Sequence, residues 1–169
     1  MRVANVQDGK LDLSTVKTVN IFDRELEKWK LERGDILLTE GGDWDKLGRG
    51  TVWNSELPMC IHQNHVFRLR VKDKSFDPNF IAVIIASPIG KLYFQSAAKK
   101  TTNLASINQR QLKAFRVPNI SLILQIEILK KVKQHKSTIL ALDQLQTQSQ
   151  LELDALPASI LARAFAGEL

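Results

Sequence analysis

The architecture of this chain is set by residues 34–42, which read GDILLTEGG. A glycine–aspartate turn leads into four residues with strong β propensity, 36–39, and two glycines follow shortly after them. The pattern predicts a buried strand that ends at a glycine-rich loop, residues 40–50. Further along the chain, residues 51–53 and 65–70 contain the same residue types and predict two more strands of a small sheet.

The predicted strand at 65–70 shows the alternation that is typical of a strand with two different faces. Val66, Arg68 and Arg70 fall on one face, whereas His65, Phe67 and Leu69 fall on the other. Because residues two apart share a face, the sheet should separate two layers of side chains.

The remaining elements before Pro118 are short. Residues 2–6 and 16–21 predict two strands separated by an Asp8-Gly9 turn, and a short helix is expected over 23–29. Two aspartate- or serine-proline pairs, at 77–78 and 87–88, predict helices that end near residues 86 and 98. Residues 1–120 are therefore expected to form a mixed α/β (α+β) domain built on a small sheet.

The chain changes character after Pro118, because good helix formers dominate the next 30 residues or so. Ser121 is a plausible cap, and residues 121–169 are expected to form a long helix of coiled-coil type with a short helix at its C-terminal end. The helix can pack on its own domain or pair with another helix, and both interpretations stay open. Steps of four and three residues define the predicted pairing seam, with polar positions inside it: Ile128, Val132, His135, Ile139, Leu142, Gln146, Ser149 and Leu153.

Composition narrows the functional classes. The chain has 169 residues, with 24 Lys and Arg against 18 Asp and Glu, so its net charge is 24 − 18 = +6. A single cysteine, Cys60, excludes an internal disulfide framework. The longest apolar run, residues 80–86, is far shorter than the roughly 20 residues that span a bilayer, and no secretory signal opens the chain. We expect a cytoplasmic protein without a membrane partner, and its positive charge favours nucleic acid as a partner.

The glycine-rich loop does not match a nucleotide or calcium loop. Gly48 is followed by Arg49 where a phosphate-binding loop needs lysine, and Leu47 stands where a calcium loop needs an oxygen ligand. Two interpretations remain: a turn with solvated charges, or a loop that presents Lys46 and Arg49 to phosphates or base edges.

Two other segments carry side chains suited to DNA. Gln63 and Asn64 have amides that can bond adenine edges. Residues 99–103 combine two cations, two hydroxyls and an amide, a set that suits phosphate and base contacts or a solvated loop. These five are Lys99, Lys100, Thr101, Thr102 and Asn103.

The sequence predicts no catalytic or metal site. Cys60, His62 and His65 lack a fourth zinc ligand nearby, and alternation on a strand would separate His65 from the other two. The stretch DPNF at 77–80 departs from the amino-methyltransferase signature at Asn79 and is interpreted as a helix start. A small nuclease or methyltransferase is the least favoured hypothesis, because neither a carboxylate cluster nor a nucleotide fingerprint is visible.

Several stretches in order resemble one family. The stretches GDILLTEGG (34–42), DKLGRG (45–50), CIHQNHVF (60–67) and TTNLASIN (101–108) resemble the target recognition domain of the specificity subunit of type I restriction–modification systems. Residues 156–165, LPASILARAF, resemble the carboxyl terminus of that subunit. The resemblance covers nearly the whole chain.

The resemblance implies a DNA reader that is not an enzyme. In this family each of two recognition domains reads one half of a split double-stranded DNA target, and each is followed by a long helix that packs against the other. Modification subunits supply methyl transfer from S-adenosylmethionine, and a restriction subunit supplies ATP-driven cleavage with its Mg²⁺. By this resemblance the chain itself would need no cofactor.

The departures from the family suggest a second function. One recognition domain and one helix are present, as in a carboxyl-terminal half, and the domain is expected to be truncated at its N-terminus. The usual proline-leucine-x-glutamate-glutamine pattern at the junction reads SLILQ at 121–125, without its proline or glutamate. The alternative is therefore an assembly element that pairs through its helix without reading DNA. A second half-subunit or a second copy of this chain could supply the missing half.

Overall fold

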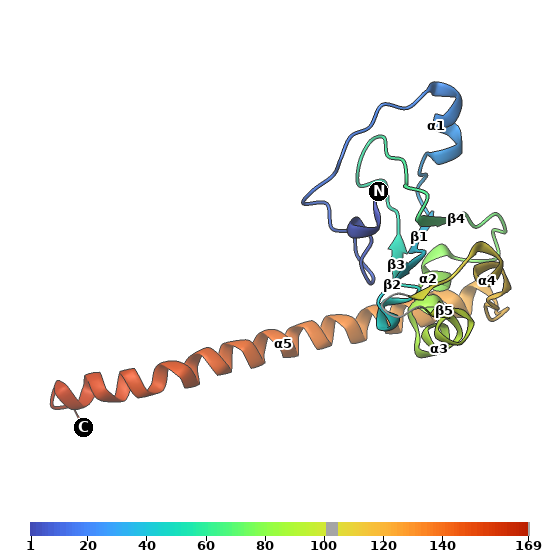
Figure 1. Ribbon diagram of the computed structural model, residues 1–169. Helices are drawn as coiled ribbons and strands as arrows, with labels where there is room; N and C mark the ends of the chain where they lie inside the picture. Colours follow the sequence, from blue (N-terminus) through green and yellow to red (C-terminus); the bar gives the residue numbers. More distant parts are fainter. Residues whose placement is uncertain (101–104, 169) are drawn as a thin grey trace. The chain divides into compact units, whose positions relative to one another are not determined.

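The computed structural model describes residues 1–100 and 105–168, and it confirms the mixed α/β class (Figure 1). The chain divides into two compact units, Met1–Leu129 and Lys130–Leu169. The first unit contains two small antiparallel sheets and the short helices. The second unit consists of the greater part of one helix.

The predicted strand at 36–39 is the centre of the main sheet. Strand β1 (Ile36–Thr39) lies between β3 (Gly50–Val52) and β4 (Val66–Leu69), and both pairings are antiparallel. All four residues of β1 are buried, as expected for a central strand covered on both faces.

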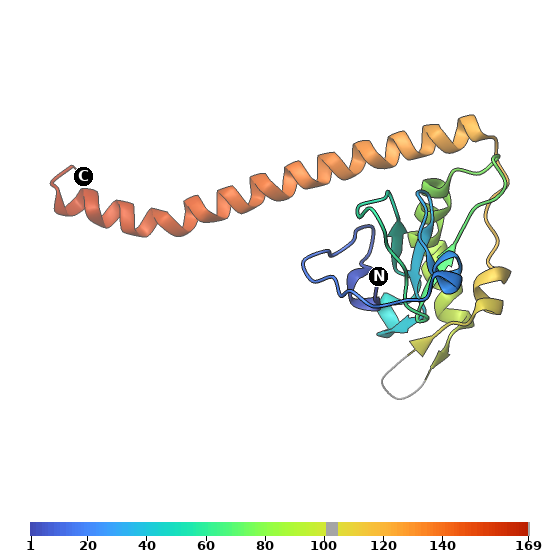
Figure 2. The same cartoon turned by 90° about the horizontal axis from the view of Figure 1, so that it is seen from above.

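The side chains predicted to alternate along residues 65–70 contribute to two hydrophobic cores, one on each face of the sheet. On one face Phe67 packs with Ile36, Leu38 and Phe94, whereas on the other Val66 packs with Leu37, Val6 and Trp53. Helices α2 (Pro78–Ala86) and α3 (Pro88–Ala97) cover the first face, and the N-terminal segment covers the second (Figures 1 and 2). Each face of the sheet is therefore closed by a different part of the sequence.

Both proline-marked helix starts are confirmed. The Asp77 carboxylate accepts from the backbone N–H of Asn79 at 2.7 Å, and the Ser87 hydroxyl accepts from that of Gly90 at 3.3 Å. The DPNF stretch is thus a capped helix start. Among the described residues no single helix is long and apolar enough to cross a bilayer, although α2 and α3 together reach that length with a 67° bend between them.

A second sheet was not predicted. Its strands are β2 (Gly41–Gly42), β6 (Ala105–Ser106) and β5 (Lys99–Lys100), in the order β2-β6-β5. Two-residue strands are too short to show an alternation of side chains, so the sequence pattern does not indicate them. A 3-10 turn, η2 (Trp44–Lys46), lies between β2 and β3, and α4 (Gln109–Ala114) begins at an Asn108–Gln111 capping box.

The strand predictions at 2–6 and 16–21 are wrong. The structure has a 3-10 turn, η1 (Val3–Asn5), and irregular backbone over 16–21. An isolated antiparallel bridge joins Val6 to Leu11, and the buried Asn5 amide donates to the carbonyl oxygens of Asp12 and Thr15, so one bridge and side-chain bonds stand where two strands were predicted. The Asp8-Gly9 turn is present, with Gly9 at φ +70°, and helix α1 spans Asp23–Trp29 as predicted.

Helix α5 (Leu122–Phe165) is longer than predicted, at 44 residues, and Ser121 caps it through a 3.4 Å bond to the N–H of Leu124. A separate short helix at the C-terminal end is absent from the described residues, because α5 continues through Pro157. Its first turns belong to the first unit. There Gln125 is fully buried and donates to the carbonyl oxygens of Ser75 and Ile120.

Candidate nucleic-acid interface

Three predicted DNA-contacting segments emerge beyond the carboxyl end of β1. Thr39 pairs with Val66, so the Gln63-Asn64 turn that precedes β4 lies at this end. The backbone N–H of Thr39 donates to the carbonyl oxygen of Arg49 at 3.1 Å, which brings the glycine-rich loop to the same end.

The third segment arrives through the second sheet. The carbonyl oxygen of Glu40, the residue after β1, accepts from the N–H of Ile107 at 2.9 Å. Gly41 and Lys99 then pair with Ser106 from its two sides. Segments that are far apart in the sequence therefore converge on one end of one strand.

The glycines of the loop make this convergence possible. A β-carbon on Gly41 would lie 2.9 Å from the carbonyl oxygen of Ala105, and one on Gly50 would lie 2.0 Å from that of Leu37. Gly48 has φ +69° and packs against the ring of Phe94. The glycine-rich character thus serves close backbone approach and a left-handed turn, rather than a phosphate cradle.

The cations of the loop differ in their availability. The Lys46 ammonium is exposed but pairs with the Asp43 carboxylate, and this hydrogen bond lowers the pKa of Asp43. Arg49 is half-buried, and its Nε is buried without a hydrogen-bond partner in the described part of the chain. Lys99 is exposed on β5.

Gln63 and Asn64 have exposed side chains, as base-reading amides require. Their turn is fixed by backbone bonds, because the carbonyl oxygen of Gln63 accepts from the N–H of Val66 at 3.0 Å. His65 Nδ1 lies 2.8 Å from a Glu40 carboxylate oxygen and ties this turn to the end of β1.

The remaining predicted DNA-contacting residues lie wholly or partly outside the part of the chain that the structure describes. The backbone of Lys100 belongs to β5, but its side chain is not described; Thr101, Thr102 and Asn103 fall outside the described residues altogether. Within the described ranges no group of three His, Cys, Asp or Glu side chains could hold a metal ion.

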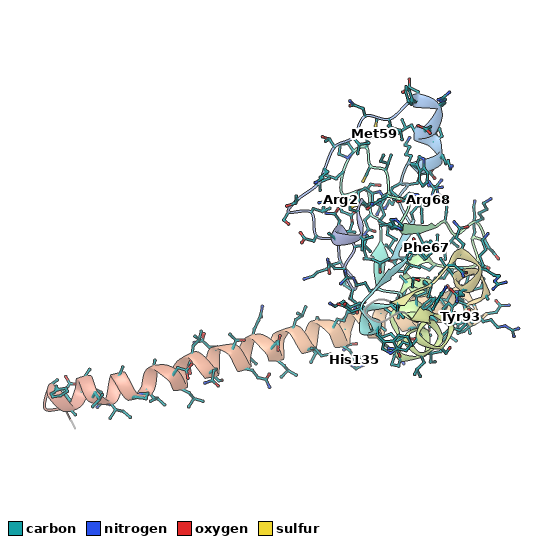
Figure 3. All side chains as sticks on the ribbon, in the orientation of Figure 1. Arg2, Met59, Phe67, Arg68, Tyr93 and His135 are labelled. Atoms are coloured by element: carbon teal, nitrogen blue, oxygen red, sulfur yellow. The ribbon has the colours of Figure 1, made fainter. Side chains whose placement is uncertain are left out.

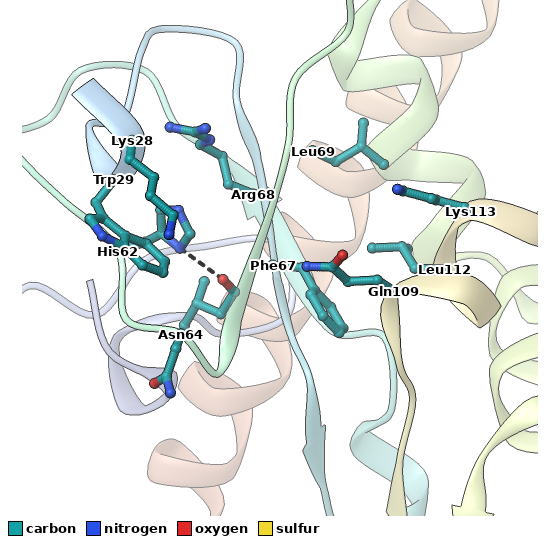
Figure 4. Close-up of a pocket in the computed structure, with 11 residues that line it drawn as sticks. Lys28, Trp29, His62, Asn64, Phe67, Arg68, Leu69, Gln109, Leu112 and Lys113 are labelled. Carbon is teal, nitrogen blue, oxygen red and sulfur yellow. Dashed lines mark hydrogen bonds between the residues drawn. The ribbon is translucent and has the colours of Figure 1, made fainter. Parts of the chain in front are cut away.

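Sequence reasoning missed a groove of about 580 Å³ beside β4 (Figure 4). Among the predicted DNA-contacting residues that the structure describes, Asn64 alone lines this groove. One wall carries the Trp29 and His62 rings, whose centroids are 5.2 Å apart, and α4 forms the other wall with Leu112 and Lys113. These side chains come from distant segments, so no sequence spacing marks the groove.

His62 is held in this groove by the backbone. Its Nδ1 lies 2.9 Å from the carbonyl oxygen of Val66 and 3.1 Å from that of Gln63. Burial lowers the pKa of the imidazole, although these two carbonyl contacts act in the opposite direction. The neutral ring is thus favoured beside Trp29.

Comparison with curated proteins gives consistent relatives. The chain is 25% identical over its full length to the StySPI specificity subunit of Salmonella potsdam, and 26% and 24% identical to the EcoBI and EcoKI subunits of Escherichia coli. All three are named type I restriction enzyme specificity subunits. The chain is a homologue of these specificity subunits.

This homology confirms the resemblance that the sequence motifs indicated. The chain spans about a third of the length of these relatives, 37% of StySPI, 35% of EcoBI and 37% of EcoKI. No family model matches the chain. The convergent end of β1 therefore lies in a homologue of specificity subunits.

Proposed function

We propose that this chain recognises a DNA sequence, without catalysing a reaction, as part of a type I restriction–modification complex. Its first unit would read one half of a split double-stranded target, and its long helix would dock the modification subunits. A restriction subunit would join them in the full complex. S-adenosylmethionine, ATP and Mg²⁺ would be bound by those partner subunits.

The observation that supports this proposal most is the convergence at the carboxyl end of β1. Exposed amides from the Gln63-Asn64 turn lie at the same end as the exposed cation Lys99 and the loop that carries Lys46. Amides can read base edges while cations contact phosphates, so one surface combines specificity with affinity. The residues we propose for DNA contact are Lys46, Arg49, Gln63, Asn64, Lys99, Lys100, Thr101, Thr102 and Asn103.

The test is a selection from randomised DNA duplexes, performed with the chain bound to a modification subunit of a type I system. We expect enrichment of one short motif. Gln63→Ala with Asn64→Ala should relax one or two positions of that motif, at a cost of about 1–3 kcal/mol each. Lys99→Ala should weaken binding to all DNA sequences alike. It should also reduce the slope of log binding constant against log salt concentration by about one unit.

Lys133→Ala, an exposed cation on α5, is the charge-matched control, and its binding should stay close to that of the wild type. Unchanged binding by all the β1-end variants would show that the assigned surface is wrong. Cleavage or methyl transfer by the purified chain alone would contradict the non-catalytic role.

The alternative function is assembly through the helix alone. The specific observation in its favour is that the apolar seam positions Ile139, Leu142 and Leu153 are all more than half exposed on α5. In this case the helix would pair with a second half-subunit or a second copy, while the first unit would bind DNA without sequence preference. A competition shift assay with the selected motif against random duplex distinguishes the two functions.

A further inference from the structure

The groove beside β4 lies along an open edge of the main sheet. In the part of the chain that the structure describes, the strand order β3-β1-β4 leaves β4 with a neighbour on one side only. Val66, Phe67, Arg68 and Leu69 all line the groove, so it follows the whole strand (Figure 4). An exposed strand edge is a ready template for another extended chain.

The hydrogen-bond register shows which backbone groups face this edge. The N–H of Glu40 donates to the carbonyl oxygen of His65, on the side of β4. The N–H of Thr39, the preceding residue, donates to the carbonyl oxygen of Arg49, on the side of β3. Hydrogen-bonded and non-hydrogen-bonded pairs alternate along an antiparallel ladder. Leu37–Arg68 and Thr39–Val66 are therefore the non-bonded pairs of β1 and β4.

The N–H and C=O groups of Val66 and Arg68 consequently point away from β1. The two backbone groups of Val66 already have partners. Its N–H donates to the carbonyl oxygen of Gln63, and its own carbonyl oxygen contacts His62 Nδ1 at 2.9 Å. The backbone N–H and C=O of Arg68 have no hydrogen-bond partner among the described residues. They form one donor and acceptor pair that an added strand could use.

The walls of the groove suit the side chains of such a strand. Successive side chains of an added strand would point alternately toward the Trp29–His62 wall and toward the Leu69–Leu112 wall. Both walls are largely apolar, so both sets of side chains would find packing surface.

Charge indicates the kind of strand. Lys28, Arg68 and Lys113 line the groove, and no carboxylate is among the lining residues that the structure describes. The Arg68 guanidinium is held at the edge by a 2.6 Å bond to the carbonyl oxygen of Lys30 (Figure 3). Pairing with the β4 edge of a second copy would bring these cations against each other, which disfavours self-association at this edge.

We propose that this groove binds an extended, acidic segment of a partner polypeptide, which adds as a strand beside β4. The backbone pair of Arg68 would bond the incoming chain, and the three cations would attract its carboxylates. This docking site overlaps the proposed DNA surface at Asn64, whereas its other described lining residues lie outside that surface.

The test uses the full chain labelled with ¹⁵N and a blocked six-residue peptide of alternating Val and Glu. Titration to millimolar peptide should shift the amide resonances of Val66–Leu69 and slow exchange of the Arg68 amide by about tenfold or more. The same peptide with alternate backbone amides N-methylated should bind about three- to tenfold more weakly, because it loses strand hydrogen bonds. A peptide with Lys in place of Glu should also bind more weakly.

Two matched variants isolate the backbone from the side chain. Arg68→Pro removes the outward N–H at a position where an edge strand tolerates proline, whereas Arg68→Ala keeps it. Arg68→Pro should bind the Glu peptide about three- to tenfold more weakly than Arg68→Ala. Lys28→Glu with Lys113→Glu should reverse the preference between the Glu and Lys peptides.

Three outcomes would overturn the proposal. One is the absence of shifts along β4 at millimolar peptide. Another is equal binding of the N-methylated peptide, a measurement that needs no variant. The third is displacement of the peptide by a single-stranded oligonucleotide that itself shifts these amides more strongly, because the groove would then be a nucleic-acid site. None of these outcomes depends on whether the β1 end reads DNA.

Discussion

Arg70 and Asp35 form a two-pronged ion pair across the ends of β4 and β1. Arg70 Nε donates to Asp35 Oδ1 at 2.7 Å, and Nη2 donates to Oδ2 at 2.8 Å. The Asp35 side chain is completely inaccessible to solvent, and it also accepts from the N–H of Glu32. The carboxylate raises the pKa of Arg70 and joins β4 to the turn before β1.

We expect Asp35→Asn to lower the free energy of unfolding by about 1.5–3 kcal/mol, because it removes the charge from a buried acceptor that bonds the partly exposed Arg70 guanidinium. Urea unfolding followed by circular dichroism measures this. Glu32→Gln is the control, since the same arginine contacts this exposed carboxylate; it should change stability by less than about 1 kcal/mol. Similar losses for both variants would show that burial does not strengthen the Asp35 contact.

Gln125 anchors the start of α5 in the first unit. Its Oε1 accepts from the N–H of Asp77 at 2.9 Å, and its Nε2 donates to Ser75 and Ile120. Gln125→Leu leaves these partly buried backbone groups without their partner and should destabilise the first unit by about 1–3 kcal/mol. Thermal unfolding measures this loss of stability. In the same measurement Gln134→Leu, at an exposed position of α5, should be nearly neutral.

Two glycines of one loop should respond differently to alanine. Gly48→Ala meets both a left-handed backbone, φ +69°, and the Phe94 ring at 2.5 Å, so we expect a loss of about 2–4 kcal/mol. Gly42, at φ +159°, also has positive-φ backbone, but a β-carbon there meets no atom within 4 Å. Gly42→Ala should therefore cost less than Gly48→Ala, because it carries backbone strain without the clash; an equal cost at both sites would contradict the packing argument.

His62 should make stability depend on pH. Its pKa is lowered by burial, so the unfolded chain takes up a proton before the folded chain does. As the pH falls through about 6.5, the free energy of unfolding should decrease, and it should continue to decrease until the lowered pKa of the folded state is reached. Urea titrations from pH 7.5 to 5.5 should show a steeper decrease in the free energy of unfolding for the wild type than for His62→Gln. His135→Gln, on the exposed surface of α5, should follow the wild type.

The proposed helix pairing can be tested on one face of α5. Ile139→Asp with Leu142→Asp introduces charge into the seam and should abolish association, as measured by analytical ultracentrifugation of the chain alone or with a second half-subunit. Leu140 is equally exposed, but it lies about 160° around the helix from Leu142. Leu140→Asp should therefore leave association intact. If the wild-type chain associates with neither partner, the pairing hypothesis fails.

Local patterns were sufficient for several elements. The strand over 36–39, the alternation around Phe67 and the proline-marked helix starts each depend on residues within about one turn of structure. Caps and face periodicity are set by neighbouring residues, so a reader of the sequence can find them. The order of matched stretches likewise indicated the family that the comparisons bear out.

Long-range contacts account for what the sequence did not reveal. The two-residue strands of the second sheet exist because Ser106 pairs with Gly41 on one side and Lys99 on the other. Residues 16–21, although rich in β-forming side chains, have no strand to pair with and remain irregular. The groove beside β4 brings together Trp29, His62 and Leu112 from three separate segments. Such features arise from packing between distant parts of the chain, and sequence spacing does not encode the distances on which that packing depends.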